Sequence, residues 1–403
     1  MNRASSIIRR LIVAVSLLLG LIGSTTAVIT ATPASAGTGG AVVSVPITTA
    51  VVQGGVTWLV VPMGHLSDFL NRFWQLFVRT PTDTGWVTVT PPGVADNGGL
   101  VITAGPDGGL LAGFLANQDL TFSPLSLTTD GGQTWTAVYF PQGLTAVPDA
   151  LGGTTGMTVA LGRSGEGDLL ETGADLSSLS SWRPAVTVAR LRRSAAGARC
   201  GVDRLTATAV APDGDPLLGT ACGHRGVVGL FDVAGGGAKA VAFPVSSTLT
   251  GATVSVLRLV ATASGVAVLL GARERTGRTV LVAGWLSPSG QPGAPSAPLE
   301  VPVGAKLLAS GTTPGGGVFV LLQPANGSAP ELADVTASGT GEPAWDMPPR
   351  PPRGTLGAAF SSGRIDAVTV HSSTLIDYAF DQSSATWVRS QVVHVPVQYG
   401  SSS

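Results

Sequence analysis

A motif that recurs along the chain restricts its fold more than any other feature. Residues 125–135 run from a leucine to a tryptophan as LSLTTDGGQTW, and a β-rich segment ending in proline follows them. Residues 76–86 repeat this arrangement in a degenerate form of the same length. Later copies keep the β-rich segment alone, at residues 182–188, 240–244, 298–302, 345–348 and 387–396. Seven units therefore follow one another, and Trp86 and Trp387 are 301 residues apart, which gives a mean period near 50.

Each unit has room for three or four short strands. In the second unit we expect them at residues 100–104, 110–115, 122–128 and 134–140, and in the last unit at 365–370, 374–380 and 386–395. These segments are rich in Val, Leu and Thr and are bounded by Gly, Pro, Asp and Ser, as is usual for strands. Four short strands in a unit of about 50 residues are typical of a propeller blade.

The repeat predicts an all-β fold, a single β-propeller that spans residues 37–398 and leaves residues 399–403 as a short C-terminal tail. We expect seven blades of about 50 residues, with six or eight as alternatives because the fourth to sixth units vary in length. Residues 37–47 are expected to add a strand that closes the first blade onto the last, since a closed ring has no long sheet edge. Apolar residues at helical spacing between Leu66 and Phe77 also allow a short helix before a strand near Trp74.

The composition agrees with this fold and excludes several classes of protein. Gly and Pro number 55 and 28, which favours many turns, and 44% of the residues are hydrophobic, enough for a large core. Only 12% are charged, about half the usual share, so a disordered charged chain is excluded. The formal net charge of −1 predicts no binding to nucleic acid or to an anionic membrane surface.

The first 36 residues have the pattern of an export signal. Three arginines precede an apolar run at residues 11–22, and the small residues 34–36 fit a signal peptidase site. We therefore predict a signal peptide at residues 1–36 and a secreted protein, in the medium or at the cell envelope. The alternative is an uncleaved anchor, for which this run is short. The apolar stretch 254–272 contains Arg258 and a turn signal, so we expect two strands there and no transmembrane segment after cleavage.

Residues 128–135, with the sequence TTDGGQTW, resemble the Asp-box or BNR motif of sialidase-like and sortilin-like propellers. The match is carried by Thr128, Asp130, Gly132, Thr134 and Trp135, and a partial match by Asp83, Gly85 and Trp86. In such a hairpin turn Asp130 would accept hydrogen bonds from turn amides, Gly132 would take a positive φ, and Trp135 would pack on the blade. The resemblance implies a structural motif at the outer edge of a blade, away from a catalytic face.

The same resemblance makes sialidase activity a hypothesis to be tested against the residues. Sialidases of this family resemble one another in an arginine triad, a tyrosine nucleophile paired with a glutamate, and an aspartic acid. Their usual Arg-Ile-Pro segment is absent, and the nearest sequence, Arg364-Ile365-Asp366, lies in the last unit. The three tyrosines, Tyr139, Tyr378 and Tyr399, do not map onto the family's catalytic positions. The chain therefore resembles a divergent member without recognisable sialidase catalytic residues.

Other sequence patterns indicate little chemistry. Two close carboxylate pairs, Glu166/Asp168 and Asp213/Asp215, could serve glycoside hydrolysis, but they lie among Gly and Pro and are expected in polar turns. Asp213 and Asp215 also lack the further ligands of a calcium loop. No zinc motif is formed by the four histidines, His65, His224, His371 and His394. We predict no catalytic residue, no cofactor and no metal.

Five arginines gather in the fourth unit and could bind an anion. They are Arg190, Arg192, Arg193, Arg199 and Arg204. A solvated strand or loop face is the interpretation that we prefer for them.

The two cysteines, Cys200 and Cys222, are 22 residues apart and flank two β-rich segments. Since cysteine pairs outside the cell are usually oxidised, we expect a disulfide that links strands or loops. A catalytic thiol is the alternative, and His224 is too near in sequence to be a convincing base for it.

These observations favour a secreted, non-catalytic propeller that acts as a binding or scaffolding module at the cell envelope or in the medium. Its partner would be an extracellular protein or glycan, and a monomer is expected. The binding site would lie on the concave face around the central channel. The alternative is a sialidase-like or other glycoside hydrolase acting on extracellular glycans, and a third possibility is an envelope assembly factor. Two carboxylates about 5–9 Å apart in a deep pocket would favour the hydrolase.

Overall fold

The structure is a computed structural model of the chain. It describes residues 48–64, 72–91, 99–105, 109–115, 121–165, 167–174, 176, 179–244, 247–262, 264–313, 316–337, 348–361 and 363–396. The predicted signal peptide at residues 1–36, the predicted closing strand at 37–47 and the tail at 399–403 lie outside these residues.

The described strands form successive antiparallel meanders, in which each strand pairs with the next along the chain. Among the described residues there are seven such meanders. They are β1 (Thr48–Gln53), β2 (Val56–Gly64), β3 (Arg72–Arg79) and β4 (Val87–Thr88); β5 (Leu100–Ala104), β6 (Leu110–Phe114), β7 (Ser123–Thr128) and β8 (Thr136–Phe140); β10 (Leu151–Thr154), β11 (Met157–Ser164), β12 (Gly167–Gly173) and β13 (Trp182–Thr187), with β9 (Gly143–Leu144) beside β11; β14 (Val202–Val210), β15 (Pro216–Arg225), β16 (Leu230–Asp232) and β17 (Lys239–Ala240); β18 (Thr253–Thr262), β19 (Gly265–Arg273), β20 (Thr279–Leu286) and β21 (Leu299–Val301); β22 (Lys306–Thr312), β23 (Val318–Gln323) and β24 (Glu331–Asp334); and β25 (Thr355–Ser361), β26 (Arg364–His371), β27 (Thr374–Asp381) and β28 (Thr386–His394).

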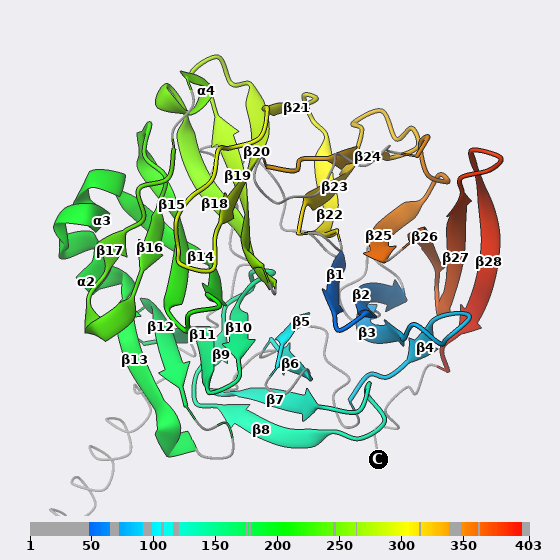
Figure 1. Cartoon of the computed structure of the whole chain (residues 1–403), viewed down its shortest axis with the longest axis horizontal. Helices are drawn as coiled ribbons and strands as arrows, with labels where there is room; N and C mark the ends of the chain where they lie inside the picture. The colour runs from blue at the N-terminus through cyan, green and yellow to red at the C-terminus, as the bar shows by residue number, and fades with distance from the viewer. Residues whose placement is uncertain are drawn as a thin grey trace, which may run out of the picture. The chain divides into compact units, whose positions relative to one another are not determined.

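The first strands of the meanders follow one another around a common axis (Figure 1). β1 contacts β5, β5 contacts β10, β10 contacts β14, and β14 contacts β18. Arg258 on β18 donates a hydrogen bond to Ser310 on β22, and both β22 and β1 contact β25. The order of the first strands is therefore cyclic, and the chain is an all-β propeller. The number of blades in the whole chain stays a prediction.

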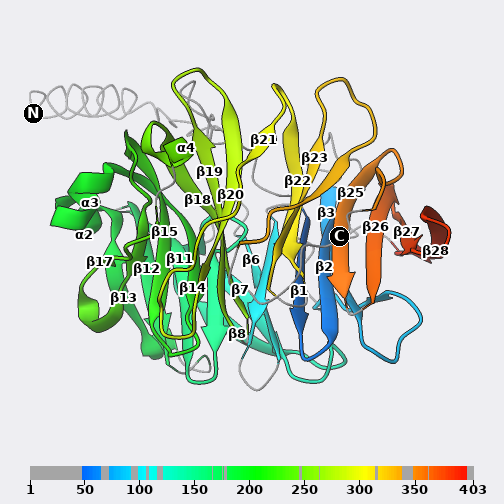
Figure 2. The ribbon, with the colours of Figure 1, turned by 45° about the horizontal axis from the view of Figure 1, so that its top comes forward.

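Two pairs of meanders also share strand pairing. β1 pairs with β22 in parallel, with Thr48 opposite Ala309, so that the first and sixth meanders form one sheet (Figure 2). β15 pairs with β18 in antiparallel orientation, which joins the fourth and fifth meanders. The last meander, β25 to β28, forms a sheet of its own, linked to the first by an isolated bridge between Gly64 and Ser372.

Most of the strands expected from the sequence are found within one or two residues of their predicted bounds. The expected strand at 100–104 is β5, and the apolar stretch 254–272 is the hairpin of β18 and β19, as predicted. The strand expected from Trp74 onward is β3, which begins at Arg72. The short helix expected before it falls largely on residues 65–71, outside the described residues.

Four of the five arginines of the arginine-rich run lie on helices, so the strand or loop expected there is wrong for them, although all five are exposed to solvent as expected. Arg204 lies on β14, and the helices are α2 (Val188–Arg193) and α3 (Ala195–Cys200). Two hydroxyl caps explain them: the Oγ1 of Thr187 accepts from the N–H of Arg190 at 3.2 Å, and the Oγ of Ser194 accepts from the N–H of Gly197 at 3.0 Å. Within the described ranges no helix is long and apolar enough to cross a membrane.

Tryptophans of the repeated motif lie between neighbouring meanders. Trp182, at the start of β13, packs edge-on against Phe140 of the preceding meander, with ring centroids 4.9 Å apart. Trp86, before β4, is buried in a cluster with Phe360 of the last meander. Trp135, before β8, packs on a cluster built from the first and second meanders. The periodic tryptophan therefore joins each of these meanders to the one before it.

A buried ionic network joins the last meander to the first. Asp366 on β26 forms a close ion pair with Arg79 of β3 and a second one, at 2.6 Å, with Arg364. Arg364 also binds Asp377 on β27 at 2.9 Å, and both carboxylates are fully buried. The Arg79 guanidinium lies over the ring of Trp86, 4.5 Å from its centroid. This network adds to the isolated bridge between Gly64 and Ser372 and to the apolar cluster around Trp86, which also connect these two meanders.

The environment of Asp377 gives the network a pH dependence. Burial raises the pKa of Asp377 from 3.8 to about 6, and the charge of Asp366 acts in the same direction, while hydrogen bonds and charge from Ser390, Arg364 and Trp86 oppose the rise. A carboxyl group with a raised pKa holds its proton more tightly in the folded chain than in the unfolded chain. Its contribution to stability is therefore complete below about pH 4 and is lost as the pH rises to about 6.

We predict that Asp377→Asn removes this pH dependence, because an amide cannot ionise. Two pKa units correspond to about 3 kcal/mol, so the free energy of unfolding of the wild type should fall by roughly this amount, relative to the variant, between pH 4 and pH 6.5. Thermal unfolding across this range measures the difference. Asp381→Asn on the same strand is the control, since hydrogen bonds from Ser383 and Ser384 lower the pKa of Asp381. If the free energies of unfolding of the wild type and D377N differ by the same amount at every pH, the raised pKa assigned to Asp377 is wrong.

A disulfide ties the helices to the fourth meander. Cys200, the last residue of α3, is bonded to Cys222 on β15, so the expected pairing is present. Gly229 lies against both sulfur atoms, and a Cβ there would come within 2.7 Å of the Cys222 Sγ. The bond fixes α3 on the sheet that follows it in the chain.

Replacing both cysteines by serine should lower the free energy of unfolding by about 3 kcal/mol, because the disulfide closes a loop of 22 residues in the unfolded chain. Urea denaturation under oxidising conditions measures the loss. A reductant should destabilise the wild type to a similar extent and leave the double serine variant unchanged. Equal sensitivity of both proteins to the reductant would show that the bond does not stabilise the fold.

Candidate functional site

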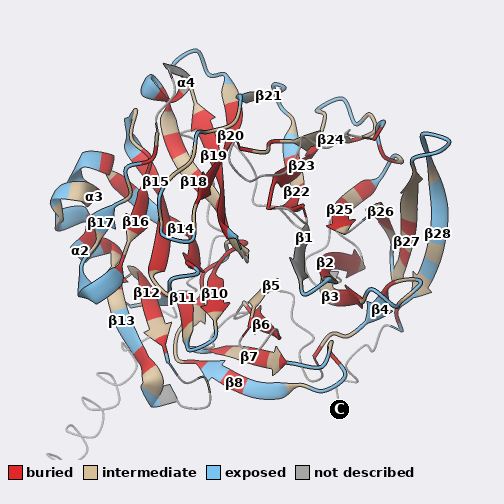
Figure 3. Cartoon of the chain, viewed as in Figure 1, coloured by how far each residue is buried: buried red, intermediate tan, exposed pale blue. Residues whose placement is uncertain are grey.

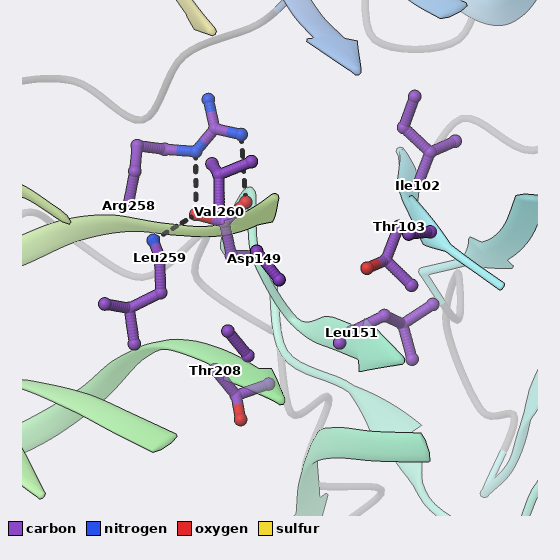
Figure 4. A pocket seen from close by; sticks show the side chains of 12 residues that line it. Ile102, Thr103, Asp149, Leu151, Thr208, Arg258, Leu259 and Val260 are labelled. Carbon is purple, nitrogen blue, oxygen red and sulfur yellow. Dashed lines mark hydrogen bonds and ion pairs between the residues drawn. The ribbon is translucent and has the colours of Figure 1, made fainter. Parts of the chain in front are cut away.

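The sequence places the expected binding site around the propeller axis, and the structure has a small pocket there. Its walls come from the first strands β5, β10, β14 and β18 and from the residues just before β10 (Figure 4). The cavity volume is about 20 Å³, which is room for one or two water molecules. Pockets that hold a small-molecule ligand are usually at least tenfold larger. In this structure the pocket cannot hold a sugar.

A buried ion pair forms the polar part of this pocket. Asp149 lies two residues before β10, and Arg258 lies in the middle of β18 (Figure 4). The guanidinium donates from Nε to Oδ2 at 2.7 Å and from Nη2 to Oδ1 at 2.9 Å. The backbone N–H of Leu259 adds a third bond to Oδ2 at 2.8 Å. Both oxygens of Asp149 are therefore occupied.

The remaining donor of Arg258 is also used. Its Nη1 donates to the carbonyl oxygen of Ser310 at 2.7 Å and to the Ser310 Oγ at 2.8 Å. The backbone of Asp149 is held as well, because its carbonyl accepts from the N–H of Thr208 at 2.8 Å. A charge pair with this many bonds is a structural connection between first strands, since a catalytic carboxylate needs a free face toward its substrate.

The pocket lacks the carboxylate pair that glycoside hydrolysis requires. Asp149 is the one carboxylate among the residues that line it. Asp366 and Asp377 do share an arginine, but both are fully buried in the network between the first and last meanders. A buried, arginine-bridged pair has no space for the water and the glycosidic oxygen between its members.

Three of the four carboxylates singled out as pairs in the sequence, Asp168, Asp213 and Asp215, are exposed or half-buried. Asp213 and Asp215 bracket a turn, in which the N–H of Asp215 donates to the Asp213 Oδ1 at 3.2 Å. Burial and the charges of Asp232 and Asp213 raise the pKa of Asp215. Asp168 forms an exposed ion pair with Arg163 at 3.0 Å, and Glu166 lies outside the described residues. The first pair occupies the polar turn that the sequence predicts.

The turn of residues 128–135 is held by its own side chains. The Oδ1 of Asp130 accepts from the N–H of Thr134 at 2.9 Å, and the Oδ2 accepts from the Thr134 hydroxyl at 2.6 Å. These bonds lower the pKa of Asp130 to about 2. Gly132 has a φ of +86° and lies against Val89 of the first meander. The carboxylate is thus used within the turn, and the identification of this turn as an Asp box stays a prediction.

The degenerate copy has a similar local bond in a different position. The Oδ2 of Asp83 accepts from the N–H of Thr80 at 2.8 Å, which lowers the pKa of Asp83. Gly85 and Trp86 lie against the side chain of Gln391 on β28, whose amide accepts from the Trp86 N–H and donates to its carbonyl. This turn therefore contacts the last meander instead of pointing to solvent.

No metal site emerges among the described residues, where no group of three or more His, Cys, Asp or Glu could hold an ion. His224 contacts the carbonyl of Arg199 through Nδ1, and His394 contacts the hydroxyl of Thr374. Tyr139 is exposed on β8 and Tyr378 lies on β27, while His65 and Tyr399 lie outside the described residues. The predicted absence of a cofactor stays a prediction.

Sequence reasoning missed the residues that shape the axis. Arg258 was visible as one charge in an apolar strand, but nothing near it in sequence pointed to Asp149, 109 residues away. Arg79 and Asp366 are 287 residues apart. A charged residue inside an otherwise apolar β segment is the signal that could have identified Arg258 as buried and paired, because an unpaired buried charge is strongly disfavoured.

No model of a protein family matches the chain, and no match is found among curated proteins. Among solved structures it is similar to the GH74 xyloglucanase from Xanthomonas campestris, with 13% identity and a TM-score of 0.49 over 83% of this chain and 52% of that one, about half its length. The Aleuria aurantia lectin, a six-bladed propeller, is 11% identical with a TM-score of 0.38, over 88% of this chain and 96% of the lectin. The propeller domain of the Trilobed protease from Pyrococcus furiosus is 9% identical with a TM-score of 0.46, over 86% of this chain and 98% of that domain. The propeller fold of this chain follows from its own sheet order.

Separating the axial ion pair should destabilise the fold strongly. Asp149→Leu leaves Arg258 buried without a counter-charge, so we expect a loss of about 3–5 kcal/mol in the free energy of unfolding. The double variant D149L/R258M should lose less than the sum of the two single variants, because the pair acts as a unit. Urea denaturation measures all three.

The exposed ion pair between Arg278 and Glu300, at 3.0 Å, is the matched control for this cycle. It should show a coupling below about 1 kcal/mol. Equal coupling energies for the axial pair and the exposed pair would contradict the structural role given to Asp149 and Arg258.

Proposed function

We propose that the chain is a non-catalytic propeller that binds or scaffolds a partner outside the cell, at the envelope or in the medium. The observation that carries the proposal is the small, fully bonded pocket among the first strands. It has room only for water, and its one carboxylate, Asp149, accepts from three donors. A carboxylate held in this way is not free to act on a substrate.

Several features support a location outside the cell. The disulfide between Cys200 and Cys222 favours an oxidising compartment. The predicted signal peptide at residues 1–36 would deliver the chain there. We propose a monomer with seven blades and an extracellular protein or glycan as its partner. The near-neutral net charge of −1 gives no support to nucleic acid as the general partner.

We also propose that residues 128–135 are an Asp box with a structural role, as in the sialidase-like and sortilin-like propellers that the motif resembles. The support is local: both oxygens of Asp130 bind Thr134, and Gly132 takes the positive φ that the turn needs. Since the carboxylate is used within the turn, it is not offered to a ligand.

The alternative, a sialidase-like or other glycoside hydrolase, has less support. It requires two carboxylates on either side of one sugar, with a gap of about 5–9 Å between them. The axial pocket offers Asp149 alone, and that residue is neutralised by Arg258.

The test combines binding with turnover. We expect the purified chain to hydrolyse no aryl glycoside, sialosides included, while a bound partner raises its unfolding temperature. A glycan present at 100 times its dissociation constant should add about 2.7 kcal/mol to the free energy of unfolding. The panel is sialylated, cell-wall and neutral glycans, and Ca²⁺, under oxidising conditions.

Turnover that scales with protein concentration and stays constant per protein through further purification would contradict the proposal and favour a hydrolase. Stabilisation without product release supports a binding module. The absence of any shift would point to a protein partner.

A further inference from the structure

The two helices α2 and α3 carry the most one-sided charge in the described chain. Between residues 183 and 204 there are six arginines and one acidic residue, Asp203, in a protein whose formal net charge is −1. Arg190, Arg192, Arg193, Arg199 and Arg204 are all exposed. We call these five residues the arginine surface. It covers α2 and α3, which lie on the outer side of the ring (Figures 1 and 3), and the first residues of β14.

This surface is held rigidly. Val188 and Leu191 are buried beneath α2, which packs on β12, β13 and β14, while α3 packs on β15 and β17. Arg192 donates from Nε to the carbonyl of Val202 at 2.7 Å, and the disulfide of Cys200 fixes the end of α3. Caps at Thr187 and Ser194 begin the two helices. The guanidinium groups therefore project from a preorganised support, which reduces the entropy lost when they bind.

Arg190, Arg192 and Arg193 lie in the last turn of α2, and Arg199 lies in the last turn of α3, where a positive charge complements the helix dipole. The spacing of Arg190 and Arg193 brings two like charges together. Within the described residues, the guanidinium groups of Arg190 and Arg199 donate to no other group, while Arg204 has only a long contact of 3.7 Å with Asp203. Exposed donors without partners are available to an external anion.

The surroundings of the arginine surface indicate what kind of anion it suits. Large exposed hydrophobic side chains occur at Val87, Phe122, Tyr139, Val303, Val388 and Val392, none of them on α2, α3 or β14. A membrane-binding surface needs apolar anchors beside its basic residues, and single-stranded nucleic acid is usually stacked on aromatic rings. The guanidinium group pairs with two oxygens of a carboxylate or phosphate at once. A polar, extended polyanion fits this surface best.

We propose that the arginine surface docks an acidic polysaccharide, whose anionic groups recur along the chain and pair with successive guanidinium groups. This inference rests on the proposed binding function and names the partner class and its place on the fold. It puts the binding surface at α2 and α3 and not at the small pocket among the first strands.

The test compares two triple variants for binding to polygalacturonate, with neutral dextran as the blank. Arg190→Ser/Arg193→Ser/Arg199→Ser removes three charges from the arginine surface and keeps Arg192, which ties α2 to β14. Arg275→Ser/Arg353→Ser/Arg389→Ser removes three exposed arginines elsewhere and is the matched control, with the same net charge. Thermal unfolding without ligand checks that both variants fold.

We expect polygalacturonate to bind the wild type at about 10 mM salt and to be released as the salt rises above about 100 mM, where the Debye length falls to about 10 Å. The α2–α3 variant should bind at least about tenfold more weakly, because three charge-assisted contacts are lost, while the control should stay within about twofold. This difference supports the proposal.

Equal weakening in both variants would show that overall charge governs binding and would overturn the assignment to α2 and α3. Tighter binding to vesicles containing anionic lipid, or to single-stranded DNA, than to polygalacturonate would overturn the polysaccharide assignment. No binding of polygalacturonate by the wild type at low salt would overturn the inference and leave the binding function standing, since that is tested by the glycan panel and by turnover.

Discussion

The ring depends first on the ion pair of Asp149 and Arg258. One guanidinium joins three first strands, because it binds Asp149 before β10 and Ser310 on β22 while its own backbone belongs to β18. Burying two charges is strongly unfavourable unless every donor and acceptor is satisfied, and here the pair has its bonds filled by side chains and backbone. The consequence for function is that a ligand entering this pocket would have to displace a charge pair whose bonds are already filled.

A second network of buried, paired charges lies where the last meander meets the first. Asp366 and Asp377 are bridged by Arg364, and Arg79 reaches across from β3, so polar groups again make the connection that strand pairing makes between β1 and β22. Around these two networks the blades are joined by apolar contacts. The tryptophans of the repeat are the clearest of these, since Trp182 packs on the preceding meander. At Trp86, Trp135 and Trp182 the repeat seen in the sequence therefore corresponds to a packing contact between neighbouring meanders.

The difference between local patterns and long-range contacts explains which parts of the fold could be predicted from the sequence. Strands such as β5 and the hairpin of β18 and β19 follow from short-range patterns of apolar residues and turn signals, so they were predicted closely. The partner of Arg258 could not be predicted from the sequence. Its contact with Asp149 depends on the cyclic order of strands that are more than a hundred residues apart. The helices α2 and α3 were missed for a different reason. Their caps, Thr187 and Ser194, and their alanines are visible in the sequence, but the propeller repeat favoured a strand there.

The paired charges among the first strands and the exposed arginines of α2 and α3 differ in the electrostatic field that they produce in solvent. Since the central charges are paired and buried, they produce little field outside the protein, whereas the exposed arginines of α2 and α3 are close to solvent with Asp203 as their only acidic neighbour in that segment. The exposed arginines therefore give α2 and α3 a local positive charge, even though the net charge of the chain is slightly negative. The disulfide of Cys200 holds that segment in place, so a redox condition that opened it would loosen the arginine surface without touching the ion pair at the axis.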